Sequence, residues 1–240
     1  MTRLDETRLD RLPPAVAVPR FDRAGTAVGI VHLGIGAFHR AHMAVHVDDL
    51  LGGGGGDWAI CGVSLRSPAV RDALAPQHGL YTVVERGAEG ERLRVVGAVK
   101  EILVAPESPA AVLDRMAAPA TRIVSLTVTE KGYCHEPATG ALDETHPGIV
   151  HDLSNAQAPQ TAIGFLVAAL DRRRRAGLSP FTVLSCDNLP SNGDTAARIV
   201  RRFAELRDAE LGRWVGDRVA FPNTMVDRIV PATTDGDRAA

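Results

Sequence analysis

The chain has 240 residues, of which 45% are hydrophobic and 23% are charged, and its formal net charge is −2. This composition is typical of a globular protein with a sizeable core and excludes a disordered chain. Without a general excess of positive charge, non-specific binding to nucleic acid or to a membrane surface lacks its main driving force. We therefore expect neither as a partner.

The three cysteines, Cys61, Cys134 and Cys186, are odd in number, far apart and without any C-x-x-C pairing. A disulfide framework or a structural zinc site is therefore not expected. The first residues lack the apolar segment of a secretory signal, and no apolar run approaches the roughly 18 residues that span a bilayer. These features predict a cytoplasmic protein.

The N-terminal part of the chain predicts a strand–helix–strand unit behind a polar arm. Residues 1–25 contain three prolines and form the expected arm, and a single domain is expected over 26–240. The run 26–33 is short, apolar and β-branched and ends in glycines, which indicates a buried strand. A helix over 38–51, a five-glycine connector and a second buried strand over 58–65 follow. This is a βαβ unit, whose crossover should be right-handed.

The rest of the chain continues to alternate strands with helices. The predicted elements are an antiparallel insertion over 81–85 and 92–99, a helix over 108–116 capped by Ser108, a strand over 122–128, a helix over 161–175, a strand over 181–185, a helix over 195–211 and a short strand over 218–221. The pattern predicts an α/β, Rossmann-like fold: a mostly parallel twisted sheet with helices on both faces and a small antiparallel insertion.

The turn after the first strand carries two glycines in a G-x-G pattern. Gly34 allows a tight turn, and Gly36 allows a pyrophosphate to approach the backbone. The following helix offers free N–H groups and the positive end of its dipole. The third glycine of G-x-G-x-x-G is replaced by His39, so the pattern is incomplete and a purely structural turn is the alternative. Its place between a strand and a helix favours a dinucleotide site.

The expected ribose-binding acid is missing. In dinucleotide sites this acid follows the second strand, about 20 residues after the glycines. Asp57 precedes that strand, and residues 64–69 contain no carboxylate. Arg66 and Ser67 stand there instead and could face a 2′-phosphate, although Arg66 could equally be a solvated loop arginine. The sequence therefore leaves both NAD and NADP open as the cofactor.

Three histidines raise the question of a metal site. His39, His42 and His46 share one face of a regular helix, a spacing that could bind zinc. No H-E-x-x-H motif is present, and a histidine at a helix start can contact a phosphate or cap the helix. We expect no metal. A serine hydrolase is not expected either, because no G-x-S-x-G turn occurs.

Polar clusters follow three of the predicted strands, over 127–133, 185–193 and 221–229. Each cluster alone could be an ordinary turn, since Asp-Asn and Asn-Gly are common turn formers. The carboxyl ends of parallel strands meet at one edge of a sheet, where ligands of such folds bind. Together with the glycine turn, the three clusters predict a cofactor cleft.

These segments, taken together, resemble the mannitol dehydrogenase family, the long-chain polyol and sugar-acid dehydrogenases that include fructuronate reductases. The resemblance is greatest to the mannitol 2-dehydrogenase branch. The motifs that carry it, in the family's order, are VHLGIGAFHRAH (31–42), TVTEKGY (127–133), SCDNLPSNG (185–193) and MVDRIVP (225–231).

The resemblance implies a Rossmann-like domain that binds a nicotinamide cofactor, followed by a mostly helical domain. The positions that it places along the pyrophosphate are Gly34, Gly36, Ala37 and Phe38. It places Glu130 and Asp227 near the nicotinamide, and it gives Asn188 the role of polarising the reacting C–O group.

The activity implied is hydride transfer between NAD(P) and a small polyol, ketose or sugar acid, such as the mannitol–fructose pair. In the family a lysine in a K-x-x-x-x-N-x-x-H arrangement takes the proton, and this chain contains no such arrangement; Lys131 does not match it. The alternative is therefore a truncated nucleotide-binding module with impaired catalysis. We expect a monomer that can self-associate through the face on which a second domain would dock.

Overall fold

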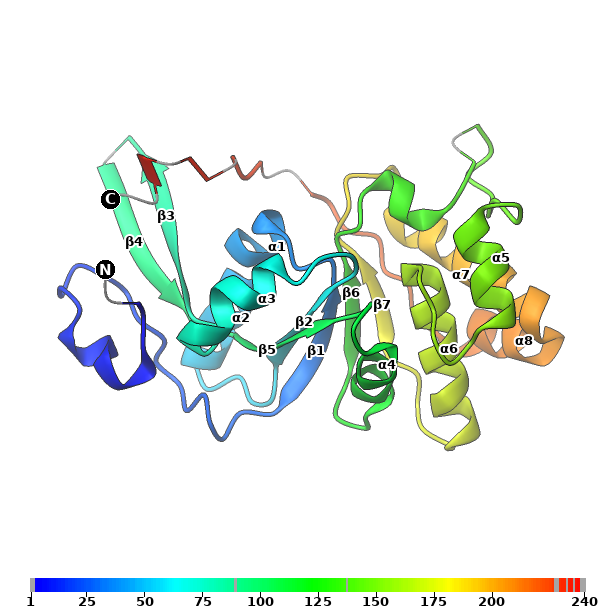
Figure 1. Ribbon diagram of the computed structural model, residues 1–240, viewed down its shortest axis with the longest axis horizontal. Helices are drawn as coiled ribbons and strands as arrows, with labels where there is room; N and C mark the ends of the chain where they lie inside the picture. Colours follow the sequence, from blue (N-terminus) through cyan, green and yellow to red (C-terminus); the bar gives the residue numbers. More distant parts are fainter. Residues whose placement is uncertain are drawn as a thin grey trace.

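The computed structural model describes residues 3–88, 90–136, 138–226, 229–231, 233–234 and 236–237. Its centre is a parallel five-stranded sheet with the strand order β5-β2-β1-β6-β7 (Figure 1). The strands are β1 (Val28–Leu33), β2 (Ala59–Ser64), β5 (Val99–Val104), β6 (Ile123–Leu126) and β7 (Thr182–Ser185). The order reverses between β1 and β6, which is the point where parallel α/β sheets open a crevice at their carboxyl edge. The predicted Rossmann-like fold is confirmed.

A separate two-stranded sheet projects from one end of the molecule (Figure 1). It is the antiparallel pair β3 (Tyr81–Gly87) and β4 (Gly90–Val96), as the sequence predicts. The prediction that its second strand continues to residue 99 is wrong, because β4 ends at Val96 and Val99 begins β5 beside β2. Only two residues separate these strands, so the sequence pattern merges them.

Helices cover both faces of the parallel sheet. They are α1 (Ala37–Ala41), α2 (Met43–Gly52), α3 (Ala69–Leu74), α4 (Pro109–Ala117), α5 (Pro147–Ser154), α6 (Ala162–Arg175), α7 (Asn192–Arg207) and α8 (Ala209–Arg218). In Figure 1, α1 to α3 lie on one side of the sheet and α4 to α8 on the other. Two separate apolar clusters fill the spaces between these layers and the sheet.

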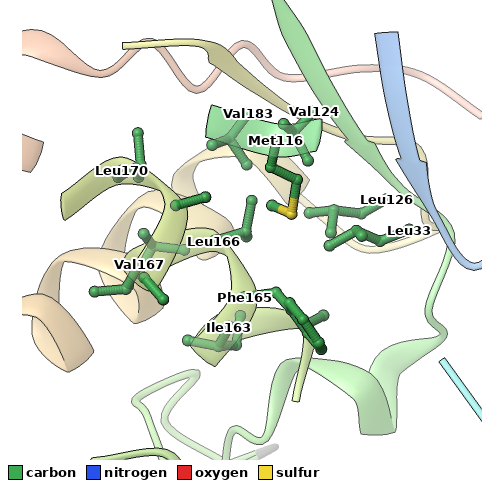
Figure 2. Packing of buried hydrophobic residues seen from close by; sticks show 14 of the residues in the cluster. Leu33, Met116, Val124, Leu126, Ile163, Phe165, Leu166, Val167, Leu170 and Val183 are labelled. Atoms are coloured by element: carbon green, nitrogen blue, oxygen red, sulfur yellow. The ribbon is translucent and has the colours of Figure 1, made fainter. Parts of the chain in front are cut away.

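Helix α6 supplies much of the larger cluster. It begins after Thr161, whose hydroxyl accepts the N–H of Gly164, and it ends before Gly177, which has a φ of +68°. Both ends match the prediction. Figure 2 shows Phe165 and Leu166 of this helix close to Met116 of α4. Removing apolar area of this kind from water contributes roughly 25 cal/mol per Å².

Two predicted helices are interrupted in the structure. The helix expected over 38–51 divides into α1 and α2 at His42, whose φ of −123° and ψ of −92° are not helical. The helix expected over 195–211 begins earlier, at Asn192, and ends before Asp208. Asp208 then caps α8 by accepting the N–H of Glu210 at 2.8 Å. In the second case the break has a plain cause, because aspartate is a strong N-cap residue.

The strand predicted over 218–221 is wrong. Helix α8 continues to Arg218, and the chain then runs beside β7 without forming a strand. A backbone hydrogen bond from Val183 to the Ala220 carbonyl, at 3.0 Å, joins the two segments.

The N-terminal residues lie against the hairpin and the edge of the sheet. Ala17 forms a bridge with Arg94 of β4. Arg23 is buried, and its guanidinium donates to the backbone carbonyls of His78 (2.7 Å), Gly97 (2.8 Å) and Val99 (3.3 Å). The division into an arm over 1–25 and a domain over 26–240 stays a prediction. Within the described residues, no helix combines the length and the apolar character needed to cross a membrane.

Candidate functional site

A cleft of about 600 Å³ opens at the carboxyl edge of the sheet. It lies where β1, β2 and β6 end, which is where the order of the strands reverses. Its walls come from five stretches of chain: 34–36, 64–67, 127–134, 146–148 and 160–162. The first three of these are segments that the sequence analysis selected. The cleft is therefore at the predicted edge of the sheet, but the clusters over 185–193 and 221–229, which were also expected in it, do not line it.

The glycine turn forms one wall of the cleft. Gly34 has a φ of +94°, and a Cβ atom there would collide with the Thr127 carbonyl oxygen. Gly34 is thus required by both its backbone conformation and its close approach to the strand β6. Gly36 is different: its φ is −86°, and the heavy atom nearest to its Cβ position is the Gly34 oxygen at 3.8 Å. A glycine at 36 therefore keeps the cleft open, and the local backbone does not require it.

Ala37 and Phe38 form the first turn of α1, directly beside the cleft. Gly36 is the N-cap and has no side chain to bond the first helical N–H groups. N–H groups at the start of a helix have no acceptor within the helix. The ring of Phe38 stacks on that of His42, with 5.0 Å between centroids. These positions agree with the role expected for 37 and 38 but do not test it.

The end of β2 contributes Ser64 to Ser67 to the cleft. Arg66 is exposed there, and the hydroxyl of Ser67 accepts the N–H of Ala69 at 3.2 Å. Among the described residues that line the cleft, none is an aspartate or glutamate, and the two cationic side chains are Arg66 and Lys131. The charge of these walls suits an anionic ligand.

Asp187 organises the neighbouring wall, and the sequence analysis missed it. This carboxylate is buried at the end of β7 and accepts hydrogen bonds from Val128 N (3.0 Å), Thr129 N (2.9 Å) and the Tyr133 hydroxyl (2.9 Å). It thereby holds the 127–133 loop, in which Thr129 has a φ of +64°. Burial and the adjacent Asp187 raise the pKa of Tyr133, so this hydroxyl stays protonated and donates. The sequence analysis included Asp187 in the polar cluster over 185–193 and gave a role only to its neighbour Asn188.

Glu130 and Asn188 are exposed and do not line the cleft. The carboxylate of Glu130 is 60% exposed and 3.9 Å from His135 Nε2. Asn188 is exposed in the loop after β7, one residue beyond Asp187. Neither side chain belongs to the described cleft walls. Asp227 lies outside the described residues.

The segment before Asp227 is fixed to the start of α7. The side chain of Asn192 donates to the Thr224 hydroxyl at 2.8 Å and accepts the N–H of Thr224 at 2.9 Å. Thr224 in turn donates to the Ser185 carbonyl at 2.7 Å. The third polar cluster is thus joined to the end of β7, although the strand expected before this cluster does not form.

The three histidines considered for a metal do not converge. His39 is fully buried and stacks on His32, with 3.4 Å between ring centroids, whereas His46 is exposed. The helix breaks at His42, and His39 is separated from the other two, whose rings stay in edge-to-face contact with 5.3 Å between centroids. In the part of the chain that the structure describes, no three histidine, cysteine or acidic side chains are placed to hold a metal ion.

The far wall of the cleft was not anticipated. His146 and Thr161 are the N-cap residues of α5 and α6, and Gln160 stands beside them. Behind them Asp152 is buried and accepts the N–H groups of Gln160 (2.8 Å) and Thr161 (2.9 Å). The sequence predicted that a helix begins at Thr161, but nothing in it indicated that this helix start faces the cleft.

Comparison with known proteins assigns the family. The family model described as the mannitol dehydrogenase Rossmann domain matches residues 28–239. The chain belongs to the mannitol dehydrogenase family. The resemblance expected from the four motifs is therefore confirmed.

The relatives within this family are close. A protein of Escherichia coli (strain K12) described as uncharacterized oxidoreductase YeiQ is 53% identical over 226 residues, which are 93% of this chain and 46% of that protein. The mannitol 2-dehydrogenase of Pyricularia oryzae is 48% identical over 228 residues, 93% of this chain and 45% of the relative. The chain thus spans about half the length of the relatives it matches.

Solved structures agree. Pseudomonas fluorescens mannitol 2-dehydrogenase, in a ternary complex with NAD and D-mannitol, superposes with a TM-score of 0.95 at 45% identity. The match covers 99% of this chain and 49% of that one. A D-sorbitol dehydrogenase in its substrate-free form gives a TM-score of 0.94 at 41% identity, over 99% of this chain and 50% of the other.

Proposed function

We propose that these 240 residues form the cofactor-binding part of an NAD(P)-dependent polyol dehydrogenase. The observation that carries the proposal is the space above Gly36. This glycine faces an open cleft at the point where the strand order reverses, and the turn before it is fixed by Gly34. A dinucleotide diphosphate needs this close approach to the backbone.

The residues present fit such a cofactor. A side chain at 36 would fill the space that Gly36 leaves free, and the cationic Lys131 complements a diphosphate, while Arg66 is the candidate contact for a 2′-phosphate. We place the diphosphate along Gly34, Gly36, Ala37 and Phe38. When bound, the nicotinamide ring would accept or donate the hydride.

For the reacting end we propose the roles that the family resemblance implies. Glu130, on the loop that Asp187 holds, and Asp227 would lie near the nicotinamide, and Asn188 would polarise the C–O bond of the substrate. The substrate would be a small polyol, with mannitol and fructose as the first pair to test because the Pseudomonas relative is described with D-mannitol.

We further propose that the 240 residues alone bind the cofactor but turn over little substrate. Their sequence contains no K-x-x-x-x-N-x-x-H arrangement, which supplies the general base in the family. A general base contributes roughly 10²–10⁴ in rate. Robust mannitol oxidation by the 240-residue protein would contradict this. The monomeric state and the cytoplasmic location remain predictions from the sequence.

The decisive experiment compares two Gly→Val variants by NADH fluorescence titration. Gly36→Val should fold normally, because its backbone is ordinary and its surroundings are open, yet it should weaken NADH binding by roughly 100-fold. Gly87→Val is the matched control, since Gly87 also faces open space but lies in the hairpin. Equal NADH affinity in the wild type and Gly36→Val would refute the site.

Cofactor preference is tested at Arg66. If this side chain contacts a 2′-phosphate, Arg66→Ala should weaken NADPH binding by roughly tenfold and leave NADH binding nearly unchanged. Arg213→Ala, an exposed arginine on α8, serves as the control. An equal loss for both cofactors would mean that Arg66 acts elsewhere on the dinucleotide.

A further inference from the structure

His32 is the second-last residue of β1 and is completely buried. Both of its ring nitrogens are hydrogen-bonded to hydroxyl groups of the neighbouring chain segment, in β6 and directly after it. Nδ1 is 2.8 Å from the Ser125 hydroxyl, and Nε2 is 2.8 Å from the Thr127 hydroxyl. Because both ring nitrogens are engaged in this way, the role of His32 depends on what Ser125 and Thr127 hold in place.

The direction of the hydrogen bonds follows from Thr127. Its hydroxyl has one proton, and the Gly34 carbonyl oxygen at 2.7 Å can only accept it. The Thr127 oxygen must then accept a proton from His32 Nε2, which leaves Nδ1 to accept the proton of Ser125. If Thr127 donated to His32 Nε2 instead, its oxygen and the Gly34 carbonyl oxygen would lie 2.7 Å apart with no proton between them. Burial lowers the pKa of His32 to about 3, so the ring is neutral and this tautomer is fixed.

The relay ends on the peptide unit between Gly34 and Ile35. Its carbonyl accepts from Thr127, and its N–H donates to the Val63 carbonyl at 3.3 Å. The same Gly34 carbonyl also accepts the N–H of Gly36 at 2.6 Å. The peptide unit is therefore held from β2 on one side and from β6 on the other, with its oxygen directed at β6.

His39 keeps His32 in place. The two rings are stacked, 3.4 Å apart and 13° from parallel. His39 is fully buried, and both its ring nitrogens lack a hydrogen-bond partner among the described residues. Its contribution here is therefore packing. His39, which stands where the dinucleotide motif has its third glycine, therefore packs against the His32 ring.

From this geometry we infer that His32 and Thr127 are positioning residues for the dinucleotide diphosphate. They hold the Gly34 carbonyl oxygen toward Thr127, just after β6, so that the dipole of this carbonyl does not oppose the negative charge of the ligand. The inference rests on the proposed cofactor site. It assigns the affinity of that site in part to a neutral hydrogen-bond relay that runs from the buried His32 to Thr127 in the cleft wall.

The test uses three variants of the 240-residue protein. Thr127→Val removes the hydroxyl and Thr127→Ser restores it. Thr121→Val is the matched control, because Thr121 is buried and donates its hydroxyl to the Arg115 carbonyl at 2.7 Å, before β6 begins and away from the cleft. NADH affinity, thermal midpoint and hydrogen exchange of residues 33–38 in the cofactor-free protein are measured for each.

We expect Thr127→Val to weaken NADH binding by roughly tenfold and to speed exchange in 33–38, with Thr127→Ser within about threefold of the wild type. Thr121→Val should lower the thermal midpoint without changing either of the other readouts. An ¹⁵N spectrum should show His32 as the Nε2–H tautomer. Unchanged affinity and exchange in Thr127→Val, or the other tautomer, would overturn the inference.

The two proposals fail in different ways. If the wild type binds no dinucleotide, the cofactor site is refuted, and exchange in 33–38 still decides whether the relay holds the turn. If Thr127→Val does not fold, Ser125→Ala removes the far end of the relay without touching the turn. That variant should weaken binding by about threefold, and no change would count against the relay.

Discussion

Two neighbouring loops at the carboxyl edge of the sheet are held by different means. The 34–36 turn is fixed by neutral groups, through Thr127 and the stacked pair of His32 and His39. The 127–133 loop is fixed by the buried carboxylate of Asp187. The comparison shows how an anionic anchor can stand beside a cationic cleft. The charge of Asp187 is bonded inward to N–H and O–H groups, while the cleft itself presents Arg66 and Lys131.

The largest effect should come from removing the anionic anchor. Asp187→Ala leaves two buried N–H groups and the Tyr133 hydroxyl without their acceptor, which should lower the free energy of unfolding by about 4 kcal/mol. Urea denaturation measures this. Asp143→Ala is the control, since Asp143 accepts two bonds from Thr145 in a more exposed loop and should cost clearly less. Equal losses would mean that burial of the anchor is irrelevant.

A second substitution acts on the neutral turn. In Gly34→Ala the new Cβ combines an unfavourable φ of +94° with a collision against β6, and we expect a loss of about 3 kcal/mol. Gly54 has a similar φ of +84° but open surroundings, so Gly54→Ala isolates the conformational cost, about 1 kcal/mol. If the two variants are equally stable, close packing of the turn on β6 is not what requires glycine.

Acid should weaken the neutral turn. Burial lowers the pKa of His32 to about 3 and that of His39 well below its usual value, so both rings are neutral when folded, whereas the unfolded chain protonates them near pH 6.5. The unfolded state then binds more protons, and stability falls as the pH drops from 6.5 toward the folded values. Between pH 6.5 and 5.5 the two rings together should cost about 2 kcal/mol.

The share of His39 in this loss can be isolated. His39→Phe keeps a stacked ring and removes a group whose nitrogens have no partner among the described residues, so it should fold and lose about half of the pH dependence. Denaturation at pH 6.5 and 5.5 gives the comparison. An undiminished pH dependence in this variant would contradict a buried neutral His39.

Much of the framework could be predicted because buried parallel strands are nearly continuous apolar runs. β1, β2, β6 and β7 were found in this way, and so was the glycine turn between β1 and α1. β5 was not distinguished because Gly97 and Ala98 alone separate it from the hairpin, and alternation continues through them. The partner of a strand is set by residues far away in the sequence, so local patterns do not reveal it.

The site was predicted in its location but not in its supports. Gly34, Gly36 and Arg66 line the cleft, as expected from their positions after the first two strands, and their contact with a cofactor stays a prediction. Asp187 was missed, since an Asp-Asn pair is also a common turn, and only the fold reveals which N–H groups it accepts. His39 was weighed as a metal ligand or phosphate contact, because sequence does not show that it is buried against His32.

The buried guanidinium of Arg23 affects where a shortened version of the protein can begin. This side chain bonds three carbonyls: that of His78, before the hairpin begins, that of Gly97, directly after it ends, and that of Val99, at the start of β5. A shortened protein that starts at residue 26 would look complete on a strand diagram. It would nonetheless leave three main-chain oxygens at this seam without their donor, so expression trials of this domain should start upstream of residue 23.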